Sequence, residues 1–108
     1  MIDIEKTVKI NMLLDFYGNL LTKKKLEYLQ LYYKEDLSLQ EIASIYHVSR
    51  NAVYDMIQRT IKQLESYENK LHLLEKFTKR QAIIRKLEAT FKDNKPLLKF
   101  LKQLDDIE

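Results

Sequence analysis

Residues that form tight turns are almost missing from this chain: glycine and proline occur once each among its 108 residues. A β-sandwich or β-barrel needs many turns, and turns draw heavily on these two residue types. A glycine-rich phosphate loop needs several glycines, and Gly18 is the only one. Hydrophobic residues still make up 45% of the sequence, which is enough for a packed core. We therefore expect an all-α fold.

Several classes of site and protein are disfavoured by the remaining composition. Cysteine is absent, which excludes disulfides, thiolate metal sites and cysteine nucleophiles. The two histidines lie too far apart in the sequence to form a metal-binding motif. No apolar run is long enough to cross a membrane, and the charged start of the chain lacks the apolar core of a signal peptide. The acidic residues are scattered and no serine has a nucleophile-like context. We expect no enzyme activity, no cofactor, no metal and no membrane contact.

Apolar residues at helical spacing predict the first two helices. One helix is expected over residues 4–20, and Thr22 is a suitable N-cap for the second. The second helix begins with three lysines, Lys23, Lys24 and Lys25, at the end where the helix dipole disfavours cations. A positive surface is one reason for such a start.

Two serines mark the starts of the next helices. Ser38 is followed three residues later by Glu41, the pattern of a capping box, and this helix is expected to end near Tyr46. After a short break, Ser49 can cap a further helix. From residue 50 to residue 92 there is no glycine or proline, which predicts one very long helix or two helices with a soft bend.

The hydrophobic repeat changes frame within that stretch. One heptad series does not continue into the next, because an extra three-residue step intervenes; the two series are Ile57, Leu64, Leu71 and Phe77, Ile84, Phe91. We expect a kink or a change of packing partner near residues 75–80, and a short terminal helix after Pro96. The predicted domains are a helix-turn-helix over residues 1–66 (winged-helix-like or sigma-region-4-like) and a C-terminal helical extension over residues 67–108. The apolar stripe of residues 57–92 exceeds what two short helices can cover, so we expect a homodimer; the alternative is that this stripe only packs on the first two helices.

The strongest pattern is a helix-turn-helix at residues 37–64, LSLQEIASIYHVSRNAVYDMIQRTIKQL. Ala43 sits where the two helices would cross most closely, a position that requires a small side chain. His47 falls at the turn position that often needs positive φ; glycine is usual there, and histidine tolerates it better than most residues. The apolar contacts that would fix the crossing come from Ile42, Tyr46, Val48, Val53 and Met56 or Ile57.

In such a unit the second helix enters the major groove of DNA. Arg50 can pair with a guanine edge, and Asn51 or Gln58 with an adenine edge. Asp55 opposes DNA contact unless it accepts from cytosine or pairs with Arg59. The candidate nucleic-acid-binding residues are Ser38, Gln40, Ser49, Arg50, Asn51, Tyr54, Gln58, Arg59 and Lys62, the last two for phosphates. The alternative is that the helix-turn-helix serves only for packing or for binding a protein.

A second basic group follows in the C-terminal extension. Its members are Lys76, Lys79, Arg80, Arg85 and Lys86. They are candidates for phosphate contact, with RNA as a possible partner, or they form a solvated helix face.

Two resemblances to known families bear on function. Residues 21–64 resemble the fourth region of bacterial sigma factors, through LTKKKLEYLQLYY and the helix-turn-helix that follows. Over about residues 2–90 the chain resembles the YlxM family of small helix-turn-helix proteins, through IEKTVKINMLLDFYGNLLT, SRNAVYDMIQRT and YENKLHLLEKF. The resemblance implies a cytoplasmic bacterial DNA-binding regulator with a link, inferred from gene neighbourhood, to the signal recognition particle pathway. The alternative is a non-catalytic adaptor that binds a protein or RNA component of that particle through its basic C-terminal helices.

Overall fold

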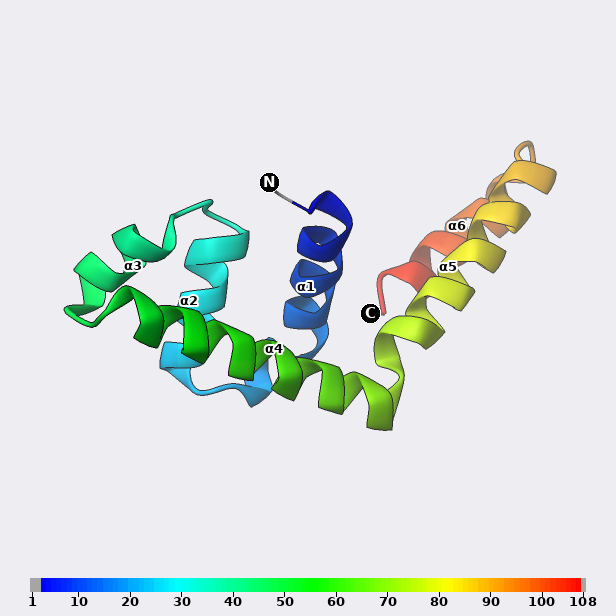
Figure 1. The fold of residues 1–108 in the computed structure, drawn as a ribbon. Coiled ribbons are helices and arrows are strands. Elements are labelled where there is room, and N and C mark those ends of the chain that lie inside the picture. Colours follow the sequence, from blue (N-terminus) through cyan, green and yellow to red (C-terminus); the bar gives the residue numbers. More distant parts are fainter. Residues whose placement is uncertain (1–2, 108) are drawn as a thin grey trace. The chain divides into compact units, whose positions relative to one another are not determined.

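The structure, a computed structural model, describes residues 3–107 and contains only helical elements in that part of the chain (Figure 1). This confirms the all-α prediction. The chain divides into two compact units, residues 1–72 and residues 73–108. The first contains four α-helices and a short 3-10 helix, and the second contains two α-helices. The elements are α1 (Ile4–Tyr17), η1 (Gly18–Leu20), α2 (Lys23–Tyr33), α3 (Leu39–Tyr46), α4 (Arg50–Leu71), α5 (Leu73–Thr90) and α6 (Lys95–Asp105).

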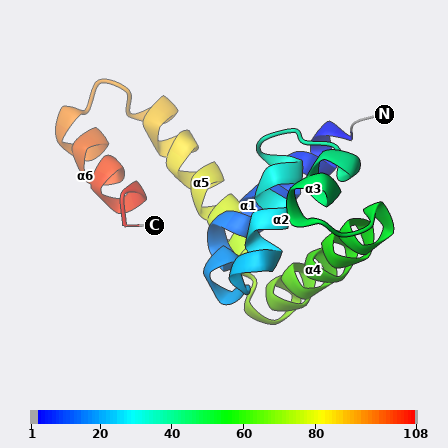
Figure 2. The ribbon, with the colours of Figure 1, turned by 90° about the vertical axis from the view of Figure 1, so that its left-hand side faces the viewer.

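The core of the first unit lies between α4 and the three helices that precede it. Each of α1, α2 and α3 packs against α4, and Figure 2 shows the three shorter helices gathered on one side of it. The apolar stripes predicted from the sequence face inward here, because burial of these side chains is the main favourable term in folding. Side chains from all four helices are fully buried, among them Leu13, Tyr17, Leu29, Ile42, Val53, Ile57 and Leu64.

The predicted helix starts are found where the sequence indicated. Thr22 caps α2, and Ser49 caps α4 by accepting from the N–H of Ala52 at 3.0 Å. At the start of α3 the capping box is complete: the hydroxyl of Ser38 accepts from the N–H of Glu41, and the carboxylate of Glu41 accepts from the N–H of Ser38, both at 3.0 Å. Each cap satisfies backbone donors that the helix itself leaves unpaired.

The crossing of α3 and α4 has the tight geometry that the sequence predicted. Ala43 is 1% exposed, and the buried residues Ile42 and Val53 come from the two crossing helices. His47 adopts the left-handed conformation, with φ 55° and ψ 44°. The N–H of Val48 donates to the carbonyl of Ala43 at 3.1 Å, the long bond of a Schellman motif, which closes the end of α3 just before α4 begins.

The break after α4 lies earlier than predicted. We expected a kink near residues 75–80, but α4 ends at Leu71 and His72 adopts the left-handed conformation, with φ 56°. The hydroxyl of Tyr17 donates to the carboxylate of Glu68 at 2.6 Å, which ties the end of α4 to α1. After Glu68 the last turn of α4 no longer packs on the core, since Leu71 is 47% exposed. The expected domain boundary at residues 66 and 67 lies inside α4, and the first unit extends to residue 72.

The second unit is a hairpin of α5 and α6. Asn94 caps α6 by accepting from the N–H of Leu97 at 3.1 Å, and Pro96 lies in the first turn, where its missing N–H is not needed. Ile84 and Leu101 are the residues that the two helices bury. In the part of the chain that the structure describes, no helix is both long enough and apolar enough to span a membrane.

Substituting leucine at the helix crossing tests the steric requirement. We expect Ala43→Leu to lower the free energy of unfolding by about 1–3 kcal/mol, because the added carbons have no space between α3 and α4. Ala52→Leu is the matched control, since Ala52 is exposed on α4. Urea unfolding followed by circular dichroism measures both; equal stability of the two variants would contradict the tight crossing.

The contact between α2 and α3 predicts a dependence of stability on pH. The hydroxyl of Tyr46 donates to Glu27 at 2.5 Å, and this bond raises the pKa of Tyr46 to about 12. Because the pKa in the folded protein lies above the ordinary value of 10.0, the bond's contribution is complete below pH 10 and is lost as the pH rises through about 12. We expect Tyr46→Phe to cost about 1 kcal/mol at pH 7 and to reduce the loss of stability between pH 10 and 12. Urea titrations at pH 7, 10 and 12 measure this, and Tyr54→Phe, at an exposed position, should behave like the unsubstituted chain.

Candidate nucleic-acid interface

The outer side of α4 presents the residues predicted to read DNA. Arg50, the first residue of α4, is exposed, and Tyr54, one turn later, is 50% exposed. Gln58 follows after another turn and is half-buried. Asn51, Arg59 and Lys62 are also exposed, whereas Val53, Ile57 and Ile61 form the buried stripe of the same helix. The six predicted residues of α4 are at least partly exposed, but they span about 180° of the helix, from Arg50, in line with the buried Ile57, to Arg59 on the opposite side.

The predicted residues near the helix starts have different roles. Ser49 is exposed, and its oxygen is used in capping, which leaves the hydroxyl hydrogen for a further acceptor. Gln40 is exposed in the first turn of α3. The N–H of Ser38, however, already donates to Glu41, and this bond, together with that from the Ser38 hydroxyl, lowers the pKa of Glu41 below its ordinary value. The start of α3 therefore carries its own anion, which makes it a poor site for a phosphate.

Asp55 is the one acidic residue among the outward side chains of this part of α4. It is exposed, and among residues 3–107 the structure has no ion pair between Asp55 and Arg59. An ion pair with Arg59, one turn later in α4, was one of the two roles expected for Asp55. The carboxylate stays available as an acceptor, which matches an exocyclic amino group of cytosine and repels a phosphate.

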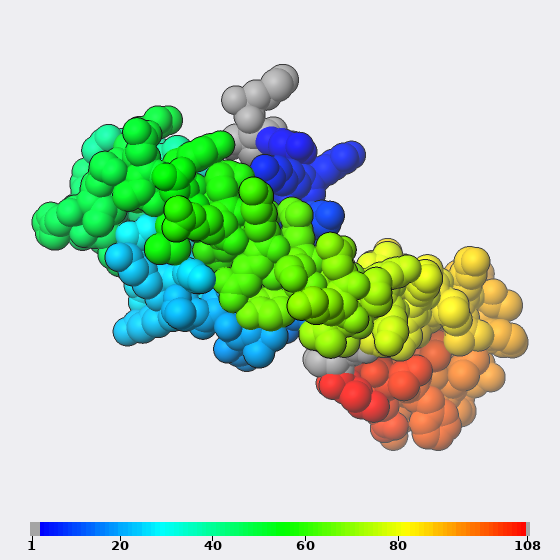
Figure 3. All heavy atoms as spheres, turned by 60° about the horizontal axis from the view of Figure 1, so that its bottom comes forward, coloured from blue at the N-terminus to red at the C-terminus, as the bar shows by residue number. Residues whose placement is uncertain are grey.

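The sequence-based site omitted the lysines that begin α2. Lys25 reaches α4, where its Nζ donates to the side chain of Gln63 at 3.1 Å. Figure 3 shows the start of α2, in light blue, directly against the green atoms of α4. Lys23 and Lys24 are exposed beside it, with Lys24 5.7 Å from the ring centroid of Tyr28. The sequence contained the signal, three lysines at the end of a helix where cations are unfavourable, but only the fold shows that Lys25 contacts α4.

The second basic group lies on α5, in the second unit. Lys79 pairs with Glu75 at 3.1 Å, and Arg80 is half-buried. Lys76, Arg85 and Lys86 are exposed. Arg85 is turned by about 140° from Arg80 around the helix axis, so the five residues do not form a single patch.

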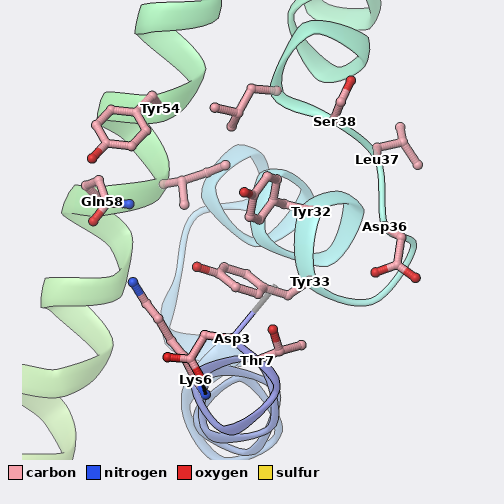
Figure 4. Close-up of a pocket in the computed structure, with 12 residues that line it drawn as sticks. Asp3, Lys6, Thr7, Tyr32, Tyr33, Asp36, Leu37, Ser38, Tyr54 and Gln58 are labelled. Carbon is pink, nitrogen blue, oxygen red and sulfur yellow. Dashed lines mark hydrogen bonds between the residues drawn. The ribbon is translucent and has the colours of Figure 1, made fainter. Parts of the chain in front are cut away.

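A cleft borders the predicted reading residues. It has a volume of about 530 Å³, and Tyr54 and Gln58 of α4 form part of its wall (Figure 4). The opposite side is formed by residues of α1, α2 and the loop that leads to α3. Across residues 3–107 no group of three or more acidic or histidine side chains is arranged to hold a metal ion.

Comparison with known proteins identifies the family. A family model described as "Putative helix-turn-helix protein, YlxM / p13 like" matches residues 4–104, which confirms the resemblance to the YlxM family. Relatives named UPF0122 protein from Bacillus thuringiensis (strain Al Hakam), Bacillus mycoides (strain KBAB4) and Bacillus cereus (strain 03BB102) are each 48% identical over 101 residues, covering 94% of this chain and 92% of theirs. The chain therefore belongs to the UPF0122 family of helix-turn-helix proteins.

Proposed function

We propose that this protein is a non-catalytic regulator that binds double-stranded DNA by inserting α4 into the major groove. The observation that carries the proposal is the exposure of Arg50, Asn51 and Tyr54 at the start of a helix whose opposite face is locked to α3 and the core. A groove-reading helix must present polar side chains in its first turns on a rigid support. Such a role would be exercised in the bacterial cytoplasm, where the DNA lies.

Each side chain has a role that follows from its chemistry. The guanidinium of Arg50 pairs bidentately with a guanine edge, and Asn51 or Gln58 pairs with an adenine edge. Arg59 and Lys62, further along α4, contact phosphates, which fixes the protein on the duplex without reading sequence. The lysines at the start of α2, beside Gln63, extend the phosphate-contacting surface. Asp55 favours cytosine at the position that it faces.

A second candidate function is suggested by the exposed basic residues of α5. On this alternative the protein is an adaptor that binds a protein or RNA component of the signal recognition particle. Arg85 and Lys86 are the better probes of this alternative, because both are exposed, whereas Lys79 already pairs with Glu75.

Duplex binding by two variants tests the first proposal. We expect Arg50→Ala to cost about 1–3 kcal/mol of binding to a selected duplex and to reduce discrimination between sequences, because a bidentate base contact is lost. We expect Lys62→Ala to weaken binding to all duplexes and to lower the slope of affinity against salt by about one. Fluorescence anisotropy with duplexes selected from a random pool, at several salt concentrations, measures both effects.

The matched control for these variants is Lys70→Ala, at an exposed lysine in the last turn of α4. It should leave duplex affinity unchanged. If Arg50→Ala and Lys62→Ala also change nothing, while charge reversal at Arg85 and Lys86 abolishes capture of an RNA or protein from a cell extract, the adaptor function replaces the DNA-binding one.

We further propose that the protein forms a homodimer through its second unit. The hairpin of α5 and α6 leaves large apolar side chains exposed, and so small a unit rarely builds a sufficient core alone; the exposed residues are Ile83, Phe91, Phe100, Leu104 and Ile107. A dimer would also present two reading helices to two half-sites.

Sedimentation measures the oligomeric state directly. At tens of micromolar we expect a species of twice the 13.0 kDa chain mass, and Phe100→Ser should shift it toward the monomer because an apolar contact is removed. Leu20→Ser, at an exposed leucine of the first unit, should leave the dimer intact. A single 13.0 kDa species at all concentrations would rule the dimer out.

A further inference from the structure

The cleft beside α4 is formed by elements from the whole first unit. Tyr32 and Tyr33 come from the end of α2, Lys6 from the first turns of α1, and Tyr54 and Gln58 from α4 (Figure 4). Its volume of about 530 Å³ lies within the range of small-molecule binding sites, roughly 300–1,000 Å³. In the proposed DNA-binding function only Tyr54 and Gln58, of the residues that line this cleft, are given contacts with bases or a place beside them, so the walls formed by α1 and α2 have no role in it.

Aromatic rings dominate one side of this cleft. The rings of Tyr32 and Tyr33 meet edge to face, with centroids 4.9 Å apart and an angle of 82° between their planes. Tyr54 and Ile57 of α4 also line the cleft. Rings held in such an arrangement offer flat apolar surfaces against which a planar ligand can stack.

Polar groups from three helices converge on the same space. Figure 4 shows the ammonium group of Lys6, the amide of Gln58 and the hydroxyls of Tyr32 and Tyr33 directed into the cleft. Within residues 3–107, the structure gives no side-chain hydrogen bond or ion pair to any of these four groups. Burial, with a smaller contribution from Tyr32, raises the pKa of Tyr33, so its hydroxyl stays a donor over the physiological range.

The charges at the edge of the cleft restrict the ligand. The carboxylates of Asp3 and Asp36 line it together with the single ammonium group of Lys6. Two acids against one base disfavour a strongly anionic ligand. The walls instead suit a neutral planar heterocycle that carries both donors and acceptors at its edge.

We propose that this cleft binds a purine nucleoside moiety, with the base against the tyrosine rings and its polar edge toward Gln58 and Lys6. The moiety has two possible sources, a free nucleoside or an unpaired nucleotide within a nucleic acid. Binding in the cleft does not require the proposed DNA-binding function. Coupling between the cleft and DNA does rest on the proposed DNA-binding function. A ligand in the cleft that contacts Tyr54 and Gln58 competes with the reading of bases by the same side chains. The ligand and the DNA therefore weaken each other's binding by the same factor.

Amide chemical shifts of the labelled full chain, titrated with adenosine, test the proposal. We expect saturable shifts at Thr7, Leu37 and Ser38, which line the cleft, and none with ribose alone. Tyr32→Leu should weaken adenosine binding about fivefold or more, because stacking on a base is lost. Lys6→Ala, at an exposed position, should weaken it about threefold without affecting folding. Lys9→Ala is the matched control: Lys9 is exposed on the same helix but does not line the cleft, and this variant should bind adenosine as the unsubstituted chain does.

A second titration separates the two sources. Shifts with free adenosine together with equal binding of a fully paired duplex and a duplex with one unpaired adenosine assign the cleft to a small ligand. Tighter binding of the duplex with the unpaired adenosine, lost in Lys6→Ala, assigns it to a nucleic acid. If adenosine gives no shifts at the cleft and the two duplexes bind equally, the proposal is overturned. Arg50→Ala keeps this result separate from the proposed function, since it should impair duplex reading and leave the adenosine shifts unchanged.

Discussion

The close approach of α3 and α4 at Ala43 is the contact on which the rest of the first unit depends. Because Ala43 is nearly inaccessible and His47 adopts a left-handed conformation, α3 can end and α4 can begin within three residues. This crossing decides which stripe of α4 faces the core and which faces outward. A bulkier residue at Ala43 would change the orientation of every outward side chain of α4 together.

The α2 helix connects that crossing to the surfaces on either side of it. In its middle, Tyr28 packs against the ring of Tyr46, with centroids 4.6 Å apart, and Glu27 accepts the hydroxyl of Tyr46. At its start, Lys25 bonds to Gln63 of α4, and at its end, Tyr33 forms a wall of the cleft. One eleven-residue helix therefore supports the predicted recognition helix, extends its positive surface and shapes the neighbouring cavity.

Local features of this fold could be predicted from sequence, whereas contacts between distant residues could not. The capping box of Ser38 and the left-handed turn at His47 depend on neighbouring residues, and periodicity alone located the outward face of α4. The end of α4 was missed, although His72 repeats the residue type recognised at position 47, because the hydrogen bond from Tyr17 to Glu68 that anchors it spans 51 positions. The cleft was missed for the same reason, since residues from four separate helices line it.

The bond between the carboxylate of Glu41 and the N–H of Ser38 has a kinetic consequence for any partner. Because the carboxylate of Glu41 lies at the start of α3, the first turn of this helix is already ordered in the isolated protein. It does not require a bound phosphate to become ordered. A module preorganised in this way loses little conformational freedom on association, so encounter is governed by diffusion and orientation rather than by coupled folding.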